Sequence, residues 1–147
     1  ATLKKRGSTL AVCILMFMSS LVVSCNLSRG ITVTPDTLPG LFISWKLLRE
    51  SYECDQGNTT NTPSTEIILT LGHRFEYTLL ENGNLVKEGS FHIEDEVISF
   101  APPLFENALS ERVTYALSGS ELILRSEELS SPGSNNFCMV KRTYGRD

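Results

Sequence analysis

The sequence predicts an all-β domain, an eight-stranded antiparallel up-and-down barrel that follows an export signal. Short β-branched and aromatic runs alternate with Gly, Asn, Asp and Pro turns over residues 42–144, a pattern typical of antiparallel strands. Phe75, Tyr77 and Leu79 fall on one face and Arg74, Glu76 and Thr78 on the other, as in a half-buried strand. Cys54 and Cys138 stand near the two ends of this region, where a bridge between them would join the first and last strands.

The first 24 residues have the three parts of an export signal. A basic Lys4-Lys5-Arg6 precedes an uncharged stretch, residues 10–23, and small Ser24 follows it. Crossing the hydrocarbon of a bilayer takes roughly 20 apolar residues, and this stretch is shorter. We therefore expect a signal peptide over residues 1–24 that is cleaved from the mature chain.

The end of that signal, Leu-Val-Val-Ser-Cys at residues 21–25, resembles the bacterial lipobox. The resemblance implies a lipoprotein in which Cys25 becomes the mature N-terminus and carries acyl chains such as palmitate. Each buried CH₂ of such chains stabilises membrane attachment by about 0.8 kcal/mol. An ordinary secretory signal with an incidental cysteine, and an uncleaved short anchor, remain as alternatives.

This resemblance also implies a location. We expect a protein anchored in the bacterial cell envelope through its N-terminal acyl chains. Asn26 follows Cys25, where enteric bacteria use aspartate to retain lipoproteins in the inner membrane, so the outer membrane is favoured.

Charge argues against nucleic acid as a partner. The first 24 residues hold three of the 13 basic residues and none of the 17 acidic ones, so the rest of the chain has a net charge of −7. An acidic domain without a basic stripe repels the phosphate backbone.

The cysteines are consistent with export. Cys13 lies in the signal and Cys25 is the expected lipid site, which leaves Cys54 and Cys138 as an even pair. We expect a disulfide between them, with two unpaired buried thiols as the alternative. Neither cysteine has the Cys-x-x-Cys or histidine neighbours of a zinc site.

The mature chain divides into a tether and one domain. Residues 25–37 are polar and small, and they predict an extended tether that holds the domain away from the lipid. Residues 38–147 predict a single β-barrel domain. Its eight expected strands are residues 42–49, 66–71, 74–80, 85–93, 97–100, 112–117, 121–125 and 136–144.

Turn residues separate these strands. Asn82-Gly83 supplies the left-handed backbone of a tight hairpin. Two stretches without strand periodicity, residues 57–64 and 101–110, are expected to be loops.

The start of the first strand, Leu-Phe-Ile-Ser-Trp-Lys-Leu at residues 41–47, resembles the Leu-x-Gly-x-Trp-x-Leu signature of lipocalin-like proteins, with Ile43 at the glycine position. The resemblance implies an eight-stranded barrel in which Trp45 plugs the closed end under an arginine of the last strand. If Cys54 pairs with Cys138, antiparallel register puts Trp45 opposite residue 147 and makes Arg146 a better partner than Arg142. Other small barrels and β-sandwiches share the strand pattern.

Two classes of function follow. The barrel could bind a small apolar or amphipathic ligand, or it could act as an envelope interaction or structural protein whose rim loops dock a partner, as in bacterial protease inhibitors of similar build. Large inward side chains are expected to line the possible cavity, and they indicate a largely filled barrel of small capacity. They weaken the carrier interpretation without removing it, so ligand binding stays the first expectation and interaction the alternative. These residues are Phe75, Tyr77, Leu79, Phe91, Tyr115 and Leu117. We find no catalytic motif and expect no enzyme activity, cofactor or metal site.

Overall fold

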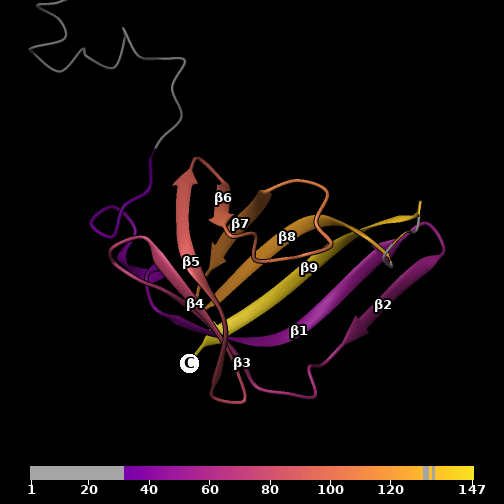
Figure 1. Cartoon of the computed structure of the whole chain (residues 1–147), viewed down its shortest axis with the longest axis horizontal. Coiled ribbons are helices and arrows are strands. Elements are labelled where there is room, and N and C mark those ends of the chain that lie inside the picture. Colours follow the sequence, from indigo (N-terminus) through magenta and orange to yellow (C-terminus); the bar gives the residue numbers. More distant parts are fainter. Residues whose placement is uncertain (1–31, 131–132, 134) are drawn as a thin grey trace, which may run out of the picture. The chain divides into compact units, whose positions relative to one another are not determined.

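The computed structural model describes residues 32–130, 133 and 135–147. The expected signal peptide at residues 1–24, the lipid site Cys25 and the first part of the tether lie outside these residues. A 3₁₀ turn, Pro39–Leu41, precedes nine strands (Figure 1). The strands are β1 Ser44–Cys54, β2 Gly57–Asn61, β3 Ile67–Leu71, β4 Glu76–Glu81, β5 Asn84–Glu94, β6 Val97–Ala101, β7 Arg112–Ser118, β8 Glu121–Leu129 and β9 Phe137–Arg146.

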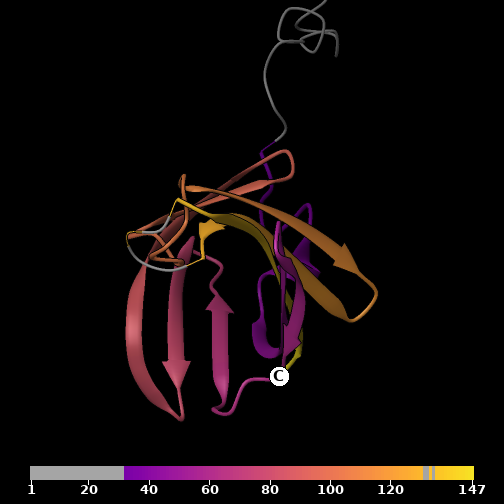
Figure 2. The same ribbon diagram turned by 90° about the vertical axis from the view of Figure 1, so that its right-hand side faces the viewer.

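The strands form one closed, eight-stranded antiparallel barrel, which confirms the predicted fold class. Each strand pairs with the next in the order β3 to β9, and β1 pairs with β9 to close the sheet. β2 and β3 both lie along the same side of β1, β2 at its C-terminal half and β3 at its N-terminal half. These two segments together occupy one of the eight strand positions. Figure 2 shows β3, β4 and β5 side by side in the wall of the barrel.

The first hairpin differs from the prediction. β1 runs five residues beyond the expected end at Arg49, and residues 57–61, expected to be part of a loop, form β2. The sequence Gly-Asn-Thr-Thr-Asn has no apolar residue and so no apolar alternation, and all five residues are exposed. Pairing with the extended β1 across the turn at Asp55 and Gln56 makes this segment a strand.

β4 also begins later than predicted. Phe75 has a φ of 62°, in the left-handed region, and its N–H donates to the carbonyl of Gly72 at 3.1 Å. Residues 72–75 therefore form a turn, and the strand begins at Glu76. The inward alternation of Tyr77 and Leu79 remains as expected.

The compact unit of the structure begins at Thr32, six residues before the boundary expected at residue 38. Thr32 forms a β-bridge with Glu94, and the N–H of Val33 donates to the carbonyl of Ile93 at 3.3 Å. Val33 is 9% exposed. Residues 32–37, assigned to the tether, therefore pack on the barrel through one apolar side chain and local backbone bonds.

Large apolar side chains fill the core. Its centre is an aromatic group with ring centroids 5.1 to 6.3 Å apart between successive members, and its members are Phe42, Phe75, Phe91, Phe100 and Tyr77. Around it lie fully buried aliphatic residues from every side of the barrel, among them Leu69, Leu71, Ile93, Ile98, Leu122 and Leu124. Burial of this apolar surface is the main force that holds the barrel together.

Candidate functional site

One end of the barrel is closed by Trp45. Its side chain is fully buried, and its indole Nε1 donates to the carbonyl of Leu41 at 2.9 Å. Leu41 ends the 3₁₀ turn and is itself fully buried. The segment before β1 is thus fastened to the first strand, and Trp45 and Leu41 seal this end.

Arg146 lies opposite Trp45 in the pairing of β1 with β9. A register shift between Leu47 and Arg49 moves the partner of Trp45 from residue 147, the position expected from the cysteines, to Arg146. The Arg146 side chain is exposed, and its Nη2 approaches Gly40 of the 3₁₀ turn. Packing of the Arg146 guanidinium over the indole ring stays a prediction.

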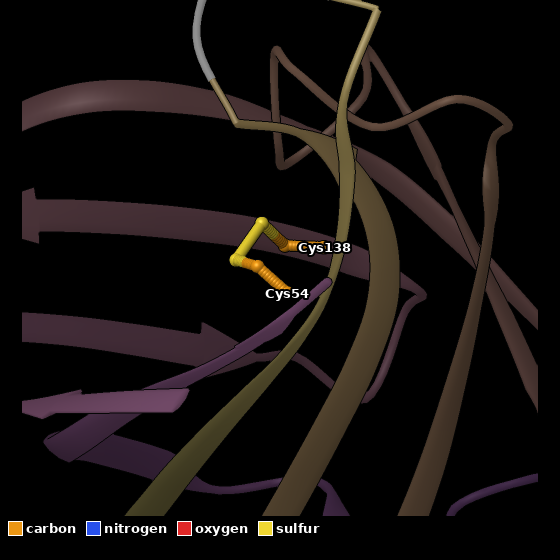
Figure 3. Close-up of a disulfide and its surroundings, with 2 residues drawn as sticks. All are labelled: Cys54 and Cys138. Atoms are coloured by element: carbon orange, nitrogen blue, oxygen red, sulfur yellow. A yellow bond between two sulfur atoms is a disulfide. The ribbon is translucent and has the colours of Figure 1, made fainter. Parts of the chain in front are cut away.

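Cys54 and Cys138 form the expected disulfide. They face each other in the register of β1 and β9, with their Cα atoms 4.3 Å apart (Figure 3). The bond joins the end of the first strand to the beginning of the last one, 84 residues later. Both cysteine side chains therefore cross-link the seam at which the barrel closes.

The β-bulge in β1 decides which side chains enter the barrel beyond Trp45. Trp45 and Leu47 point inward, and a regular strand would send Arg49, Ser51 and Glu53 inward after them. The extra residue at the bulge reverses this alternation. The inward residues therefore become Glu50, Tyr52 and Cys54, which face Arg142, Val140 and Cys138 of β9.

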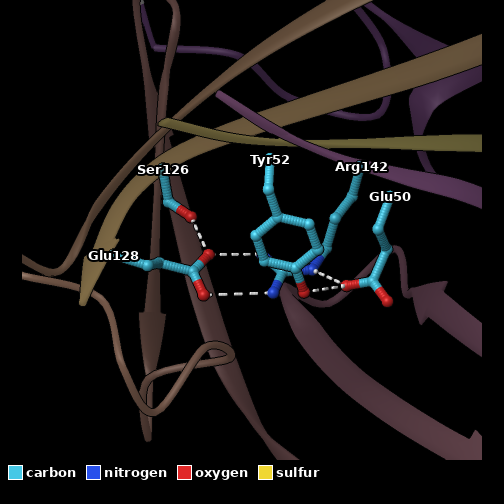
Figure 4. A network of polar contacts seen from close by, with 5 residues as sticks. All are labelled: Glu50, Tyr52, Ser126, Glu128 and Arg142. Carbon is cyan, nitrogen blue, oxygen red and sulfur yellow. Dashed lines mark hydrogen bonds and ion pairs between the residues drawn. The ribbon is translucent and has the colours of Figure 1, made fainter. Parts of the chain in front are cut away.

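Glu50, Tyr52 and Arg142 join Ser126 and Glu128 of β8 in a polar network (Figure 4). The network lies at the end of β1 away from Trp45. Arg142 lies between two carboxylates: its Nε donates to Glu50 Oε2 at 2.8 Å, and its Nη1 and Nη2 donate to the two oxygens of Glu128. The hydroxyl of Ser126 donates to Glu128, and the hydroxyl of Tyr52 donates to Glu50 at 3.4 Å.

Burial makes this network electrostatically strong. The side chains of Arg142 and Glu128 are 11% and 6% exposed. Burial by itself would lower the pKa of Arg142, but hydrogen bonding and Coulomb attraction from Glu128, with further contributions from Tyr144 and Glu50, raise it above its usual value. Arg142 is therefore a permanent cation that holds the carboxylates of Glu50 on β1 and Glu128 on β8 in place.

The connection between β6 and β7, residues 102–111, covers this polar end, and we call it the strap. The ring of Phe105 lies on Arg142, with the guanidinium carbon 3.9 Å from the ring centroid. The backbone of the strap also pairs with β8. The N–H of Leu109 donates to the backbone carbonyl of Glu127 at 2.9 Å, and the N–H of Leu129 donates to the backbone carbonyl of Asn107 at 3.0 Å. Thus the strap is fastened to β8 and β9.

The strap is fastened on the opposite wall as well. The hydroxyl of Tyr77 on β4 donates to the carbonyl of Pro102 at 2.5 Å, and Lys87 Nζ on β5 donates to the carbonyl of Pro103 at 2.9 Å. Lys87 also pairs with Glu106 at 3.6 Å. Because these anchors come from β4, β5, β8 and β9, the strap spans the polar end of the barrel.

The six residues expected to line a cavity belong to the packed interior. Tyr77 and Phe91 are members of the buried core, and the other four pack against it while partly exposed; these are Phe75, Leu79, Tyr115 and Leu117. Two depressions, of about 360 and 320 Å³, lie elsewhere. The first is lined by residues of β5, β6 and β7 that include His92 and Arg112, and the second by β1 and residues 62–66.

Sequence reasoning missed the polar network. Glu50, Tyr52, Ser126, Glu128 and Arg142 are ordinary polar residues in strand-like runs, and none forms a motif. An inward position for Ser126 and Glu128 could have been read from the alternation that begins with Leu122 and Leu124. The inward position of Glu50 could not, because it depends on the bulge.

No known family model, curated protein sequence or solved structure matches the chain. Over the part of the chain that the structure describes, no helix is long and apolar enough to cross a membrane. Within the same residues, no group of three or more His, Cys, Asp or Glu side chains is placed to hold a metal ion.

Proposed function

We propose that the chain is a lipid-anchored protein of the bacterial cell envelope whose barrel acts as an interaction module for a partner protein. The anchor is Cys25 with its acyl chains, and the outer membrane is the favoured location. The observation that supports the interaction function is the filled interior. Side chains occupy it from Trp45 to Arg142, and the strap covers the polar end.

The outer surface supports the same proposal. Leu109, Phe137 and Met139 are 44%, 46% and 39% exposed. Phe137 and Met139 lie two residues apart on the outer face of β9. Leu109 lies on the far side of exposed Glu127, which pairs with Met139 and whose carbonyl accepts the backbone N–H of Leu109. We call these three residues the β8–β9 patch. Clustered apolar side chains on a surface are typical of protein contacts.

Native mass spectrometry of residues 32–147 tests the filled interior. We expect the mass of the oxidised polypeptide alone, and no uptake of 1-anilinonaphthalene-8-sulfonate or of a fluorescent fatty acid. A photo-crosslinking residue placed at Met139 in the full chain should capture a partner in cells, while the same residue at exposed Thr114 should not. Stoichiometric lipid on the purified domain, or no difference between the two positions, would contradict the proposal.

A second candidate function is the binding of an amphipathic ligand under the strap. The observation that favours it is the polar network, which would present charged groups next to an apolar interior once Phe105 moved aside. In this case Phe105→Ala should increase uptake of the fluorescent probes several-fold, and Leu109→Ala, also in the strap, should not. If the two variants behave alike, the strap only completes the packing.

A further inference from the structure

β2 has one free strand edge along its whole length. Its five residues pair with β1 on one side, and no described strand pairs with the other side (Figure 1). All five residues are exposed. The wall continues only at β3, because residues 62–66 leave the sheet between the two segments. The backbone of β2 therefore presents unused hydrogen-bonding groups to solvent.

This edge lacks the usual protection against pairing with another chain. Natural edge strands are commonly blocked by lysine, proline, inward charges or bulges. β2 has the sequence Gly-Asn-Thr-Thr-Asn, with no charge and no proline, and its pairing with β1 is regular over all five residues. Two of its residues are β-branched threonines, which favour an extended backbone.

The edge is also held rigidly. Cys54, at the end of β1, pairs with Gly57 of β2 and is bonded to Cys138 of β9. The tip of the hairpin is therefore covalently fixed to the neighbouring strand. A preorganised strand loses less conformational entropy when a partner binds, so affinity for an added strand is higher.

We propose that the free edge of β2 is the docking site for an extended, basic segment of a partner protein, which adds as a further strand. The inference rests on the proposed interaction function and names its site. Strand addition gives affinity through main-chain hydrogen bonds, and the surrounding charge gives specificity. Residues 51–61 contain exposed Glu53 and Asp55 and no Lys or Arg, so the hairpin attracts a segment that carries lysine or arginine.

A second copy of the chain is a less suitable occupant. Pairing β2 with β2 around a two-fold axis would join two hairpins that each carry exposed Glu53 and Asp55 and no basic residue. The domain is acidic as a whole, with a net charge of −7 after residue 24, so association of two copies is opposed at long range as well.

The register identifies the backbone groups that a partner would use. Cys54 and Gly57 close the hairpin around two turn residues, so hydrogen-bonded and non-hydrogen-bonded pairs alternate from there. Asn58 and Thr60 then fall in non-hydrogen-bonded pairs, and their N–H and carbonyl groups face the free side. A proline at Thr60 removes one outward N–H and leaves the pairing with β1 intact.

The test compares Thr60→Pro with Thr60→Ala in the full chain. Both variants lose the threonine hydroxyl, which lies 3.2 Å from that of Ser51. They differ in the outward N–H and in the fixed φ of the proline ring, which an extended strand accommodates. The probes are two extended peptides of about eight residues, one alternating Lys with Thr and one alternating Glu with Thr. Binding is measured by fluorescence anisotropy, and protection of the Asn58 and Thr60 amides by hydrogen exchange.

We expect the lysine peptide to bind the native chain and Thr60→Ala, to protect both amides, and to bind Thr60→Pro about tenfold more weakly. Equal binding to the two variants, no binding to either, or a preference for the glutamate peptide would overturn the inference. So would dimerisation of the native chain that Thr60→Pro abolishes, because the occupant would then be a second copy. A partner captured from Met139 but not from Asn58 would leave the proposed function standing and refute this site.

Discussion

Cys54 and Cys138 lie directly opposite each other at the seam of the barrel and are joined by a disulfide, although they are 84 positions apart in the chain. Closing so long a loop restricts the unfolded chain strongly. In the chain-entropy model the bond stabilises the fold by about 4 kcal/mol. It also fixes the tip of the β1–β2 hairpin, which carries the proposed docking edge.

We expect the Cys54→Ala, Cys138→Ala double variant to lose about 4 kcal/mol of unfolding free energy. Urea unfolding of residues 32–147 measures the loss, and the native domain with reductant is the matched comparison. Non-reducing peptide mapping should show one linked pair of fragments. Free alkylation of both cysteines without reductant would refute the bond.

Trp45→Ala should destabilise the domain by about 3 to 5 kcal/mol, because a fully buried indole is removed from the core. Trp45→Phe should cost less. This variant loses the hydrogen bond from the indole to the Leu41 carbonyl, but that carbonyl still accepts a hydrogen bond from the N–H of Ile43 at 3.0 Å. Urea midpoints rank the variants, and a loss below about 1 kcal/mol for Trp45→Ala would mean that the indole is not part of the core.

Arg142→Met should cost about 3 to 5 kcal/mol, since Glu128 would stay buried without its cation. Replacing Arg142, Glu50 and Glu128 together by Met, Leu and Leu should recover most of that loss, because no unpaired charge remains. Arg49→Met is the surface control: Arg49 is 44% exposed and lies 3.8 Å from Glu121, so we expect a change within about 0.5 kcal/mol. Equal losses for Arg142→Met and Arg49→Met would contradict the role of the network.

Alkaline pH should destabilise the barrel through its tyrosines. Burial raises the pKa of all four, Tyr52, Tyr77, Tyr115 and Tyr144, above the usual 10.0. The unfolded chain therefore loses these protons first, and stability that is complete below pH 10 falls as pH rises from there toward the raised native values.

Tyr144→Phe isolates the largest contribution, because burial raises the pKa of Tyr144 further than that of the other tyrosines. Its loss of stability between about pH 8 and pH 11 should be smaller than that of the native domain. Urea midpoints at the two pH values, with tyrosinate absorbance as a second readout, measure this. An identical pH dependence in the two proteins would refute it.

Cys25→Ala should abolish acylation and leave the protein soluble or as an unprocessed precursor. The lipobox-like residues 21–25 are the basis of this expectation, and Cys25 lies outside the described residues. Palmitate labelling with membrane fractionation checks it, with Cys13→Ala as the control that should be acylated normally. Label at the N-terminus of the Cys25→Ala protein would show that the expected lipid anchor at Cys25 is wrong.

Local patterns in the sequence were enough for much of the fold. Alternation placed Tyr77 and Leu79 on the inner face, Asn82-Gly83 marked a hairpin, and the cysteine count paired Cys54 with Cys138. Each of these depends on a few neighbouring residues, or on a count, and the sequence carries such information directly.

Only the tertiary structure decided what lies at the polar end of the barrel and at its free edge. The bulge between Leu47 and Arg49 turns Glu50 and Tyr52 inward, and the extension of β1 makes residues 57–61 a strand. Both features depend on pairing between distant strands, and a shift of one residue exchanges the two faces of a strand. The same holds for the strap, whose Phe105 meets Arg142 only because the barrel closes.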